Sequence, residues 1–225
     1  MLTITAGRGS HFREPGFLPD MRPVVFAVHD DPSVCRLLAS LAGDAGWRSE
    51  VFDSPADFLA EPRAYVPSCL VLDVGPPPLD GLYLQRQIVL DRKDIPIIFI
   101  TAKSDVPTTV RAMKAGASDF FTKAVMRDTL ADAIHRAVER SRAALKAEAE
   151  LTVLKDRHTS LSGRENEVMG LVVSGLLNKQ VAGVLGISEI TVKAHRGRMM
   201  RKMEARSVPD LVRICAQLDV PSVRR

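Results

Sequence analysis

Residues 95–123 read IPIIFITAKSDVPTTVRAMKAGASDFFTK, and this stretch decides the fold class. It begins with a β-branched apolar run, Ile95–Thr101, which is typical of a buried strand. A segment with helical spacing follows at Val106–Ala115 and stops at Gly116, before a further strand predicted at Asp119–Thr122. Strands that alternate with helices indicate a parallel sheet covered on both faces, and such burial explains why the central runs are continuously apolar.

The same alternation extends toward the N-terminus. Short strands are predicted at Val24–Val28, Arg48–Phe52 and Cys69–Val74. A helical face between the first two strands consists of Val34, Leu37, Leu38 and Leu41. A second helix is expected to begin at Ser54, which is a good N-cap residue and is followed by proline. We therefore predict an α/β fold in which a doubly wound (βα)5 parallel-sheet domain spans residues 21–140.

Acids, a hydroxyl and a lysine follow the predicted strands at their carboxyl ends, where ligands gather in such sheets. These residues are His29, Asp30, Asp31, Asp73, Thr101 and Lys123. Two carboxylates in a partly dry cleft are compatible if Mg²⁺ bridges them, and Asp73 could then attack a phosphoryl group. Thr101 and Lys123 would hold the phosphoryl oxygens by a hydrogen bond and by charge. Each acid alone would be interpreted as a solvated loop residue, but their convergence favours a phosphoryl-transfer pocket.

Three segments resemble, in order and spacing, the receiver domain of bacterial two-component response regulators. They are HDDPSVCRLL, CLVLDVGPPPLDG and the stretch 95–123, within which DVPTTVRAMKAGASDF is similar to FixJ-type regulators. The resemblance implies that Asp73 is the phosphoacceptor and that Asp30, Asp73 and the carbonyl of Gly75 bind Mg²⁺. It also implies that the phosphoryl group is sensed by Thr101, Lys123 and the aromatic switch residue Phe120.

His29 departs from the family pattern, because it stands where the first acid of a pair is usual. An imidazole is a poor substitute for a carboxylate that orients the waters of Mg²⁺. We therefore expect weaker Mg²⁺ binding, with Asp73 still accepting phosphoryl groups. The alternative is a degenerate receiver that signals without phosphorylation.

Two further departures lie near the pocket. Ala124 replaces the proline that usually follows the lysine, so a cis peptide is not expected there, since cis bonds are rare without proline. The run Gly75-Pro76-Pro77-Pro78 predicts a stiffer loop after Asp73 than the family usually has.

Residues 126–157 contain no glycine or proline and predict one helix, of which residues 141–157 form a linker. Residues expected to face the sheet are Leu130, Ile134, Ala137 and Ser141. A weak apolar stripe continues at Leu145, Leu151 and Leu154. That stripe fits either a short coiled coil between two chains or a solvated linker helix.

The net charge of +4 conceals an asymmetry. Residues 21–126 carry 11 Lys and Arg against 13 Asp and Glu, whereas residues 158–225 carry 11 against 6. A basic C-terminal domain suggests a polyanion such as nucleic acid, although basic surface also serves solubility.

The C-terminal part, residues 158–225, is divided into helices by glycines. A first helix, patterned by Leu161 and Val168, ends at Gly175, and a second is predicted at Asn178–Leu185. A tight turn follows, and Ser188 is a plausible N-cap for a third helix. This layout predicts a helix-turn-helix, whose second helix enters the major groove. That helix is basic and free of acids between Ile190 and Met203; its basic residues are Lys193, His195, Arg196, Arg198, Arg201 and Lys202.

The motifs LSGRENEV, GLLNKQVA, GIS and TVKAH resemble the LuxR-type domain of NarL/FixJ response regulators. The resemblance implies DNA contacts by Lys179, Thr191, Lys193, Ala194, Arg196, Arg198 and Lys202, with Ala194 facing bases. It also implies an internal salt bridge or cap at Glu165. A final helix that begins at Ser207 would dimerise through Leu211, Ile214 and Leu218.

Together these features predict a cytoplasmic transcriptional regulator that a sensor histidine kinase phosphorylates and that binds promoter half-sites as a homodimer. No apolar run approaches the length of a membrane span, and no secretory signal is apparent in residues 1–20, which we expect to form a flexible extension. The three cysteines fit no metal spacing and indicate a reducing compartment.

Two rival functions are disfavoured by the sequence. An aspartate-dependent phosphatase needs a second acid two residues after Asp73, where Gly75 stands, so we predict no enzyme acting on external substrates. An adaptor with a vestigial DNA-binding domain is disfavoured by the intact TVKAH helix.

Overall fold

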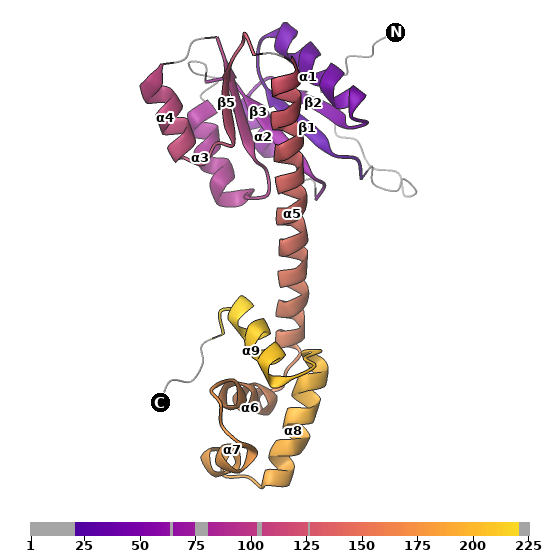
Figure 1. Ribbon diagram of the computed structural model, residues 1–225, viewed down its shortest axis with the longest axis vertical. Helices are drawn as coiled ribbons and strands as arrows, with labels where there is room; N and C mark the ends of the chain where they lie inside the picture. Colours follow the sequence, from indigo (N-terminus) through magenta and orange to yellow (C-terminus); the bar gives the residue numbers. More distant parts are fainter. Residues whose placement is uncertain (1–20, 64, 75–80, 103–104, 126, 221–225) are drawn as a thin grey trace. The chain divides into compact units, whose positions relative to one another are not determined.

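The computed structural model describes residues 21–63, 65–74, 81–102, 105–125 and 127–220 (Figure 1). The proposed N-terminal extension, residues 1–20, lies outside the described residues. The chain divides into two compact units, one ending at Arg142 and the other beginning at Ala143. This division falls inside one continuous helix.

The first unit is built on a five-stranded parallel sheet with the strand order β2-β1-β3-β4-β5. The strands are β1 (Val24–Val28), β2 (Arg48–Phe52), β3 (Ser68–Leu72), β4 (Ile97–Thr101) and β5 (Asp119–Thr122). Every residue of β1, β3 and β4 is buried, which explains why these strands are apolar except for Ser68 and Thr101 at their ends. Val28 pairs with Leu72, and Leu72 pairs with Phe99, so the three central strands end close together.

Helices cover both faces of the sheet, which confirms the predicted doubly wound α/β fold (Figure 1). They are α1 (Pro32–Asp44), α2 (Pro55–Ala60), α3 (Gly81–Asp91), α4 (Val106–Lys114) and the first part of α5 (Arg127–Thr159). One core contains Leu38 of α1 and Leu130 of α5, and the other contains Phe58 of α2 and Leu84 of α3.

The first part of α5 is attached to the sheet as its periodicity predicts. Leu130, Ile134 and Ala137 are buried in the core. The buried hydroxyl of Ser141 accepts a hydrogen bond from the backbone N–H of Ser68, at 2.9 Å. This contact satisfies a backbone donor at the start of β3 that would otherwise be buried without a partner.

The second unit consists of helices around a separate core. They are the end of α5, α6 (Gly163–Val173), α7 (Asn178–Leu185), α8 (Glu189–Lys202) and α9 (Val208–Gln217). Gly186 joins α7 to α8 with φ +65°, a left-handed conformation that glycine adopts without strain, and Ser188 caps α8. Leu154, the last member of the weak apolar stripe, packs against this core. Of the helices that the structure describes, none is long and apolar enough to cross a membrane.

Candidate functional site

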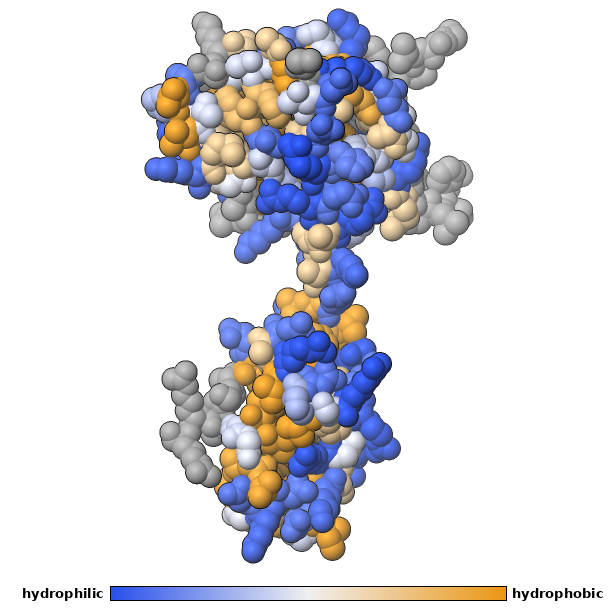
Figure 2. All heavy atoms as spheres, viewed as in Figure 1, coloured by the Kyte–Doolittle hydropathy of each residue, from blue (hydrophilic) through white to orange (hydrophobic). Residues whose placement is uncertain are grey.

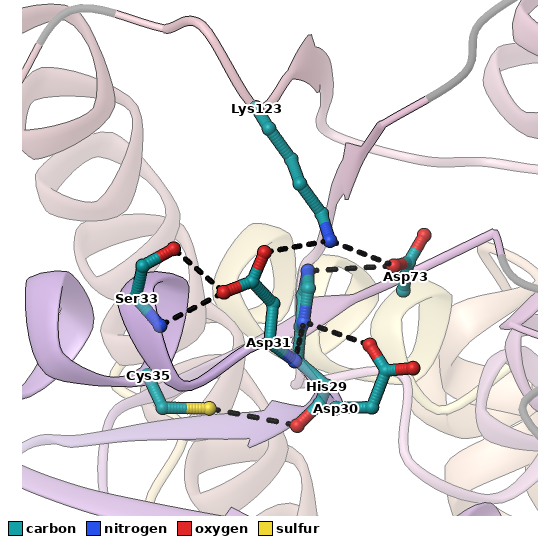
Figure 3. A network of polar contacts seen from close by, with 7 residues as sticks. All are labelled: His29, Asp30, Asp31, Ser33, Cys35, Asp73 and Lys123. Carbon is teal, nitrogen blue, oxygen red and sulfur yellow. Dashed lines mark hydrogen bonds and ion pairs between the residues drawn. The ribbon is translucent and has the colours of Figure 1, made fainter.

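The polar residues predicted at the strand ends lie together at the carboxyl edge of the sheet (Figure 3). This edge includes the point between β1 and β3 where the strand order reverses, which is where ligands bind in doubly wound sheets. His29, Asp30 and Asp73 each place one potential metal-binding atom within 4.8 Å of the others.

Asp73 sits at the centre of the site and is only 9% exposed. Its backbone N–H donates to the carbonyl of Val28, at 3.3 Å, which ties the end of β3 to β1. Its Oδ2 faces Nε2 of His29 at 3.6 Å and Nζ of Lys123 at 3.8 Å. The carboxylate is therefore flanked by two nitrogen groups from different strand ends.

Asp31 was expected at the strand ends but was given no role in the site. Its Oδ2 accepts a hydrogen bond from Lys123 at 2.9 Å, while its Oδ1 accepts from the N–H and the hydroxyl of Ser33. The Ser33 hydroxyl and then Lys123 hold the pKa of Asp31 well below its usual range. Partial burial lowers the pKa of Lys123, but the hydrogen bond and charge of Asp31 outweigh it and raise the pKa. Lys123 therefore remains a cation beside Asp73.

The imidazole side chain of His29 is fully buried. Burial lowers its pKa below the usual value, against the opposing charge of Asp73. Its Nδ1 accepts a hydrogen bond from the backbone N–H of Asp31, at 3.0 Å. A neutral, oriented ring thus stands where the family usually has a carboxylate.

Thr101 and Phe120 occupy neighbouring strands. Thr101 is 5% exposed, and its carbonyl accepts a hydrogen bond from the backbone N–H of Lys123, at 2.9 Å. The half-buried ring of Phe120 lies 5.9 Å from the ring of Phe99, centroid to centroid. The role of Thr101 and Phe120 in sensing the phosphoryl group remains a prediction. So does the expectation that the peptide at Ala124 is not cis.

Asp30 and Asp73 suit a hard divalent cation. Mg²⁺ is usually held by one or two carboxylates together with water, and the Asp30 side chain is 68% exposed to solvent. Gly75, the predicted carbonyl ligand, and the proline run after it lie outside the described residues. The carboxylates therefore fit Mg²⁺, whereas His29 does not supply an oxygen.

In the second unit, the exposed side of α8 carries the predicted DNA contacts. Lys193 and Ala194 are exposed there, and Lys179 is exposed on α7. Nζ of Lys193 lies 3.3 Å from a carboxylate oxygen of Glu189, and the Thr191 hydroxyl lies 2.8 Å from that of Ser188. These short-range contacts leave the cationic surface open to a partner.

Arg196 is partly engaged within the fold, since its guanidinium donates to the side-chain carbonyl of Asn178 at 2.8 Å. Ile190, which the sequence analysis did not assign, is 79% exposed in the first turn of α8. Val192 and Met199, seven residues apart, mark the buried side of α8, and Ile190 lies about 200° away from Val192 on a helical projection. The helical projection of the sequence alone could therefore have predicted that Ile190 is exposed on the side of α8 opposite the core.

Lys202, one of the predicted DNA contacts, also has partners inside the fold. Its Nζ donates to a carboxylate oxygen of Glu165 at 2.7 Å and to the carbonyl of Ser160 at 2.8 Å. The lysine therefore serves the fold through these partners, while its side chain stays 39% exposed and its contact with DNA stays a prediction. Arg198 also approaches Glu165, at 3.4 Å, while its side chain stays 48% exposed.

The resemblance implied an internal salt bridge or a cap at Glu165, and the structure contains both. Glu165 is 3% exposed, and its carboxylate also accepts the backbone N–H of Ser162 at 2.9 Å. The hydrogen bond from Lys202, followed by that from Ser162, lowers the pKa of Glu165 to about 2. This residue is therefore a buried anion that joins α6 to α8.

The residues of the predicted dimer seam on α9 also take part in the core of the second unit. Leu211 is 0% exposed and Ile214 is 7% exposed, and both belong to the core of the unit. Leu218 is partly buried against the same core. Of the three residues, Leu218 is the one with a partly exposed side chain, and the seam itself stays a prediction.

Comparison with known proteins assigns both halves. Residues 25–135 match the family described as response regulator receiver domain, and residues 159–215 match the family described as bacterial regulatory proteins, luxR family. Nodulation protein W of Bradyrhizobium diazoefficiens is 44% identical over 214 residues, which are 95% of this chain and 92% of that protein. Response regulator protein TodT of Pseudomonas putida is 41% identical, over 89% of this chain and 88% of that protein.

Two further similarities involve a regulator and a solved structure. Transcriptional regulatory protein FixJ of Rhizobium meliloti is 38% identical, over 84% of this chain and 93% of that protein. The low-resolution structure of response regulator StyR has a TM-score of 0.77 and 42% sequence identity. It covers 87% of this chain and 99% of its own chain.

Proposed function

Since the chain belongs to the NarL/FixJ family of response regulators, we propose that phosphorylation of Asp73 controls DNA binding by its LuxR-type domain. The observation that carries this proposal is the placement of Asp73, a nearly buried carboxylate with the Lys123 ammonium 3.8 Å away. The same chain presents the exposed cationic surface of α8. A transcriptional regulator needs both parts.

In the proposed transfer, a carboxylate oxygen of Asp73 forms a bond to phosphorus while the bond between phosphorus and the donor's leaving group breaks. Lys123 balances the added charge, and the Thr101 hydroxyl holds a phosphoryl oxygen. Asp30 and Asp73 would hold Mg²⁺, which supplies charge neutralisation when bound. The leaving group keeps the electron pair of the broken bond.

The proposed partners follow from the two units. A sensor histidine kinase donates the phosphoryl group, and promoter DNA binds the second helix of the helix-turn-helix. The active form is a homodimer, and the location is the cytoplasm, which free thiols at Cys35, Cys69 and Cys215 support. The protein modifies itself and turns over no external substrate.

The test compares the full-length chain with its Asp73→Asn variant. We expect acetyl phosphate to label the wild type once per chain, to leave the variant unlabelled, and to tighten DNA binding by the wild type alone. Fluorescence anisotropy with DNA selected from a random pool measures the binding. Labelling at another residue, or DNA binding that ignores labelling, would contradict the proposal.

A degenerate receiver is the second candidate, because a neutral His29 replaces the usual acid. That function requires the Asp73→Asn variant to bind and regulate DNA as the wild type does. A wild type that no donor labels at any Mg²⁺ concentration would favour it.

A further inference from the structure

Nε2 of His29 is a buried polar atom without a hydrogen-bond partner among the described residues. Its side chain is 0% exposed, so solvent does not compensate for the missing partner. Buried donors and acceptors are nearly always paired in folded proteins, and an exception at a site needs a physical reason. For Nε2 of His29, the reason is that the atom faces the carboxylate of Asp73.

The hydrogen bond at the opposite side of the ring decides which nitrogen carries the proton. Because Nδ1 accepts the backbone N–H of Asp31 at 3.0 Å, its lone pair is occupied and Nδ1 bears no hydrogen. The ring proton is therefore on Nε2. Figure 3 shows this nitrogen directed at Asp73, whose Oδ2 lies 3.6 Å away.

That separation is too long for a hydrogen bond, so the N–H points into the site without being used. We propose that the Nε2–H of His29 donates a hydrogen bond to an oxygen of the phosphoryl group on Asp73. This inference rests on the proposed function, and it adds a phosphoryl contact to those of Thr101 and Lys123. His29 is then a phosphoryl-binding residue.

The same geometry excludes His29 as a metal ligand while Asp31 holds the ring, since neither nitrogen has a free lone pair. It also changes the charge balance of the pocket. A carboxylate at position 29 would repel an incoming phosphoryl group unless a cation screened it, whereas an N–H dipole attracts one. Asp73 should therefore still be phosphorylated at a measurable rate when no divalent cation is present.

Nuclear magnetic resonance of the ring nitrogens tests the first step directly in the full-length protein. We expect an unprotonated Nδ1 and a protonated Nε2, with the Nε2–H resonance shifting when beryllofluoride, a phosphoryl mimic, binds in the absence of Mg²⁺. A proton on Nδ1, or an Nε2–H that ignores bound beryllofluoride, would overturn the inference. Neither measurement depends on labelling.

Three variants test the consequence, with acetyl phosphate as the donor and EDTA present. His29→Gln keeps an N–H donor near Nε2, whereas the shorter amide of His29→Asn reaches only the position of Nδ1 and leaves no donor near Nε2. His29→Asp adds a charge. We expect labelling in EDTA to fall about tenfold or more in the Asn and Asp variants, the loss of about one charge-assisted hydrogen bond. The Gln variant should retain most of the rate, and Mg²⁺ should restore labelling in the Asp variant.

Equal rates in EDTA for the wild type and the Asn variant would overturn the role of His29. Absence of labelling in the wild type under every condition would instead contradict the proposed function, and the ring resonances would then decide the role of His29. If a variant fails to fold, as judged by circular dichroism, the wild-type resonances still decide it.

Discussion

Gly81 determines how closely the start of α3 approaches the backbone of Asp73 at the end of β3. A Cβ at this position would lie 2.2 Å from the carbonyl oxygen of Asp73 and 3.0 Å from the Phe99 ring. Both neighbours belong to the buried end of the sheet, so neither moves freely. Any side chain here must displace the backbone that carries Asp73.

We expect Gly81→Ala to destabilise the first unit by about 1–3 kcal/mol, the usual range for overpacking a tight core. It should also slow labelling of Asp73. Urea unfolding followed by fluorescence measures the first effect, because the only tryptophan, Trp47, lies in this unit. Gly43→Ala is the control: Gly43 has nothing within 4 Å, and alanine there should be neutral or stabilise by up to about 1 kcal/mol. Equal stabilities for the two variants would refute the close approach.

Glu165 makes the second unit sensitive to acid. Its pKa in the folded chain is about 2, below the ordinary value of 4.5, because Lys202 and Ser162 stabilise the carboxylate. A lowered pKa contributes stability that is fully present above about pH 4.5 and is lost as the pH falls toward 2. The ion pair thus strengthens the junction of α6 and α8 at neutral pH.

Glu165→Gln should therefore lower the stability of the second unit at pH 7 and flatten its dependence on pH between about 4.5 and 2. Unfolding followed by circular dichroism, at a series of pH values, measures the difference between wild type and variant. The tryptophan signal of the first unit serves as the internal control. A difference that stays constant across this pH range would show that the carboxylate charge is not responsible.

At the residue scale, the sequence predicted those site residues whose position depends only on where a strand ends. Asp73, Thr101 and Lys123 could be placed because parallel strands end at one edge of a sheet. The partnership of Asp31 with Lys123 could not, because it joins residues 92 positions apart through two flexible side chains. The ring orientation of His29 likewise depends on a local turn that periodicity does not report.

At the scale of elements, patterns revealed which faces are apolar but not what covers them. The family resemblance implied an interface along the apolar residues of α9, yet Leu211 and Ile214 also complete the unit's own core. The bounds of β1, β2, β5 and α7 were predicted correctly, because turn residues flank them. No bounds were predicted for α3, which follows the proline run and carries little periodicity.

Two lysines of α8, nine positions apart, should have separable roles. Lys193→Gln removes an exposed cation, so DNA affinity should fall and the slope of log affinity against log salt should decrease by about 1. Stability should not change. Lys202→Gln removes the partner of Glu165, so stability should fall while the salt slope stays the same.

Anisotropy titrations at several salt concentrations and urea unfolding of both variants provide the measurements. Arg213→Ala is the matched control, because Arg213 is a 75% exposed cation of the same unit that lies on α9. Should Lys202→Gln change the salt slope as much as Lys193→Gln does, Lys202 would contact DNA after all.

At the scale of the whole molecule, α5 is the covalent and helical link between receiver and DNA-binding domain. Its 33 residues run without a break from Arg127 to Thr159, and the division between units falls within it. Figure 2 shows hydrophilic and hydrophobic residues side by side on the visible face of each unit. The buried cores of the two units consist of different residues. The core residues of each unit come from that unit's own elements, so the middle of α5 can be altered without changing a residue of either core.

Ala147 is exposed in the middle of this helix. Proline there would remove a backbone hydrogen bond and clash with the preceding turn, at a cost of about 3 kcal/mol to the helix. If a continuous helix transmits phosphorylation, the ratio of DNA affinities with and without the phosphoryl group on Asp73 should fall toward 1 in Ala147→Pro. The unphosphorylated affinity should stay within about twofold, because α8 is unchanged, a difference of less than about 0.5 kcal/mol.

Ala147→Gln separates helix continuity from the loss of alanine, because glutamine is a good helix former and adds no charge. This control should keep the wild-type ratio, as measured by anisotropy with labelled and unlabelled protein. Labelling of Asp73 must proceed equally in all three chains, since the pocket draws no residue from this part of α5. A proline variant that still responds fully to phosphorylation would mean that the signal passes between the units by a route other than the helix.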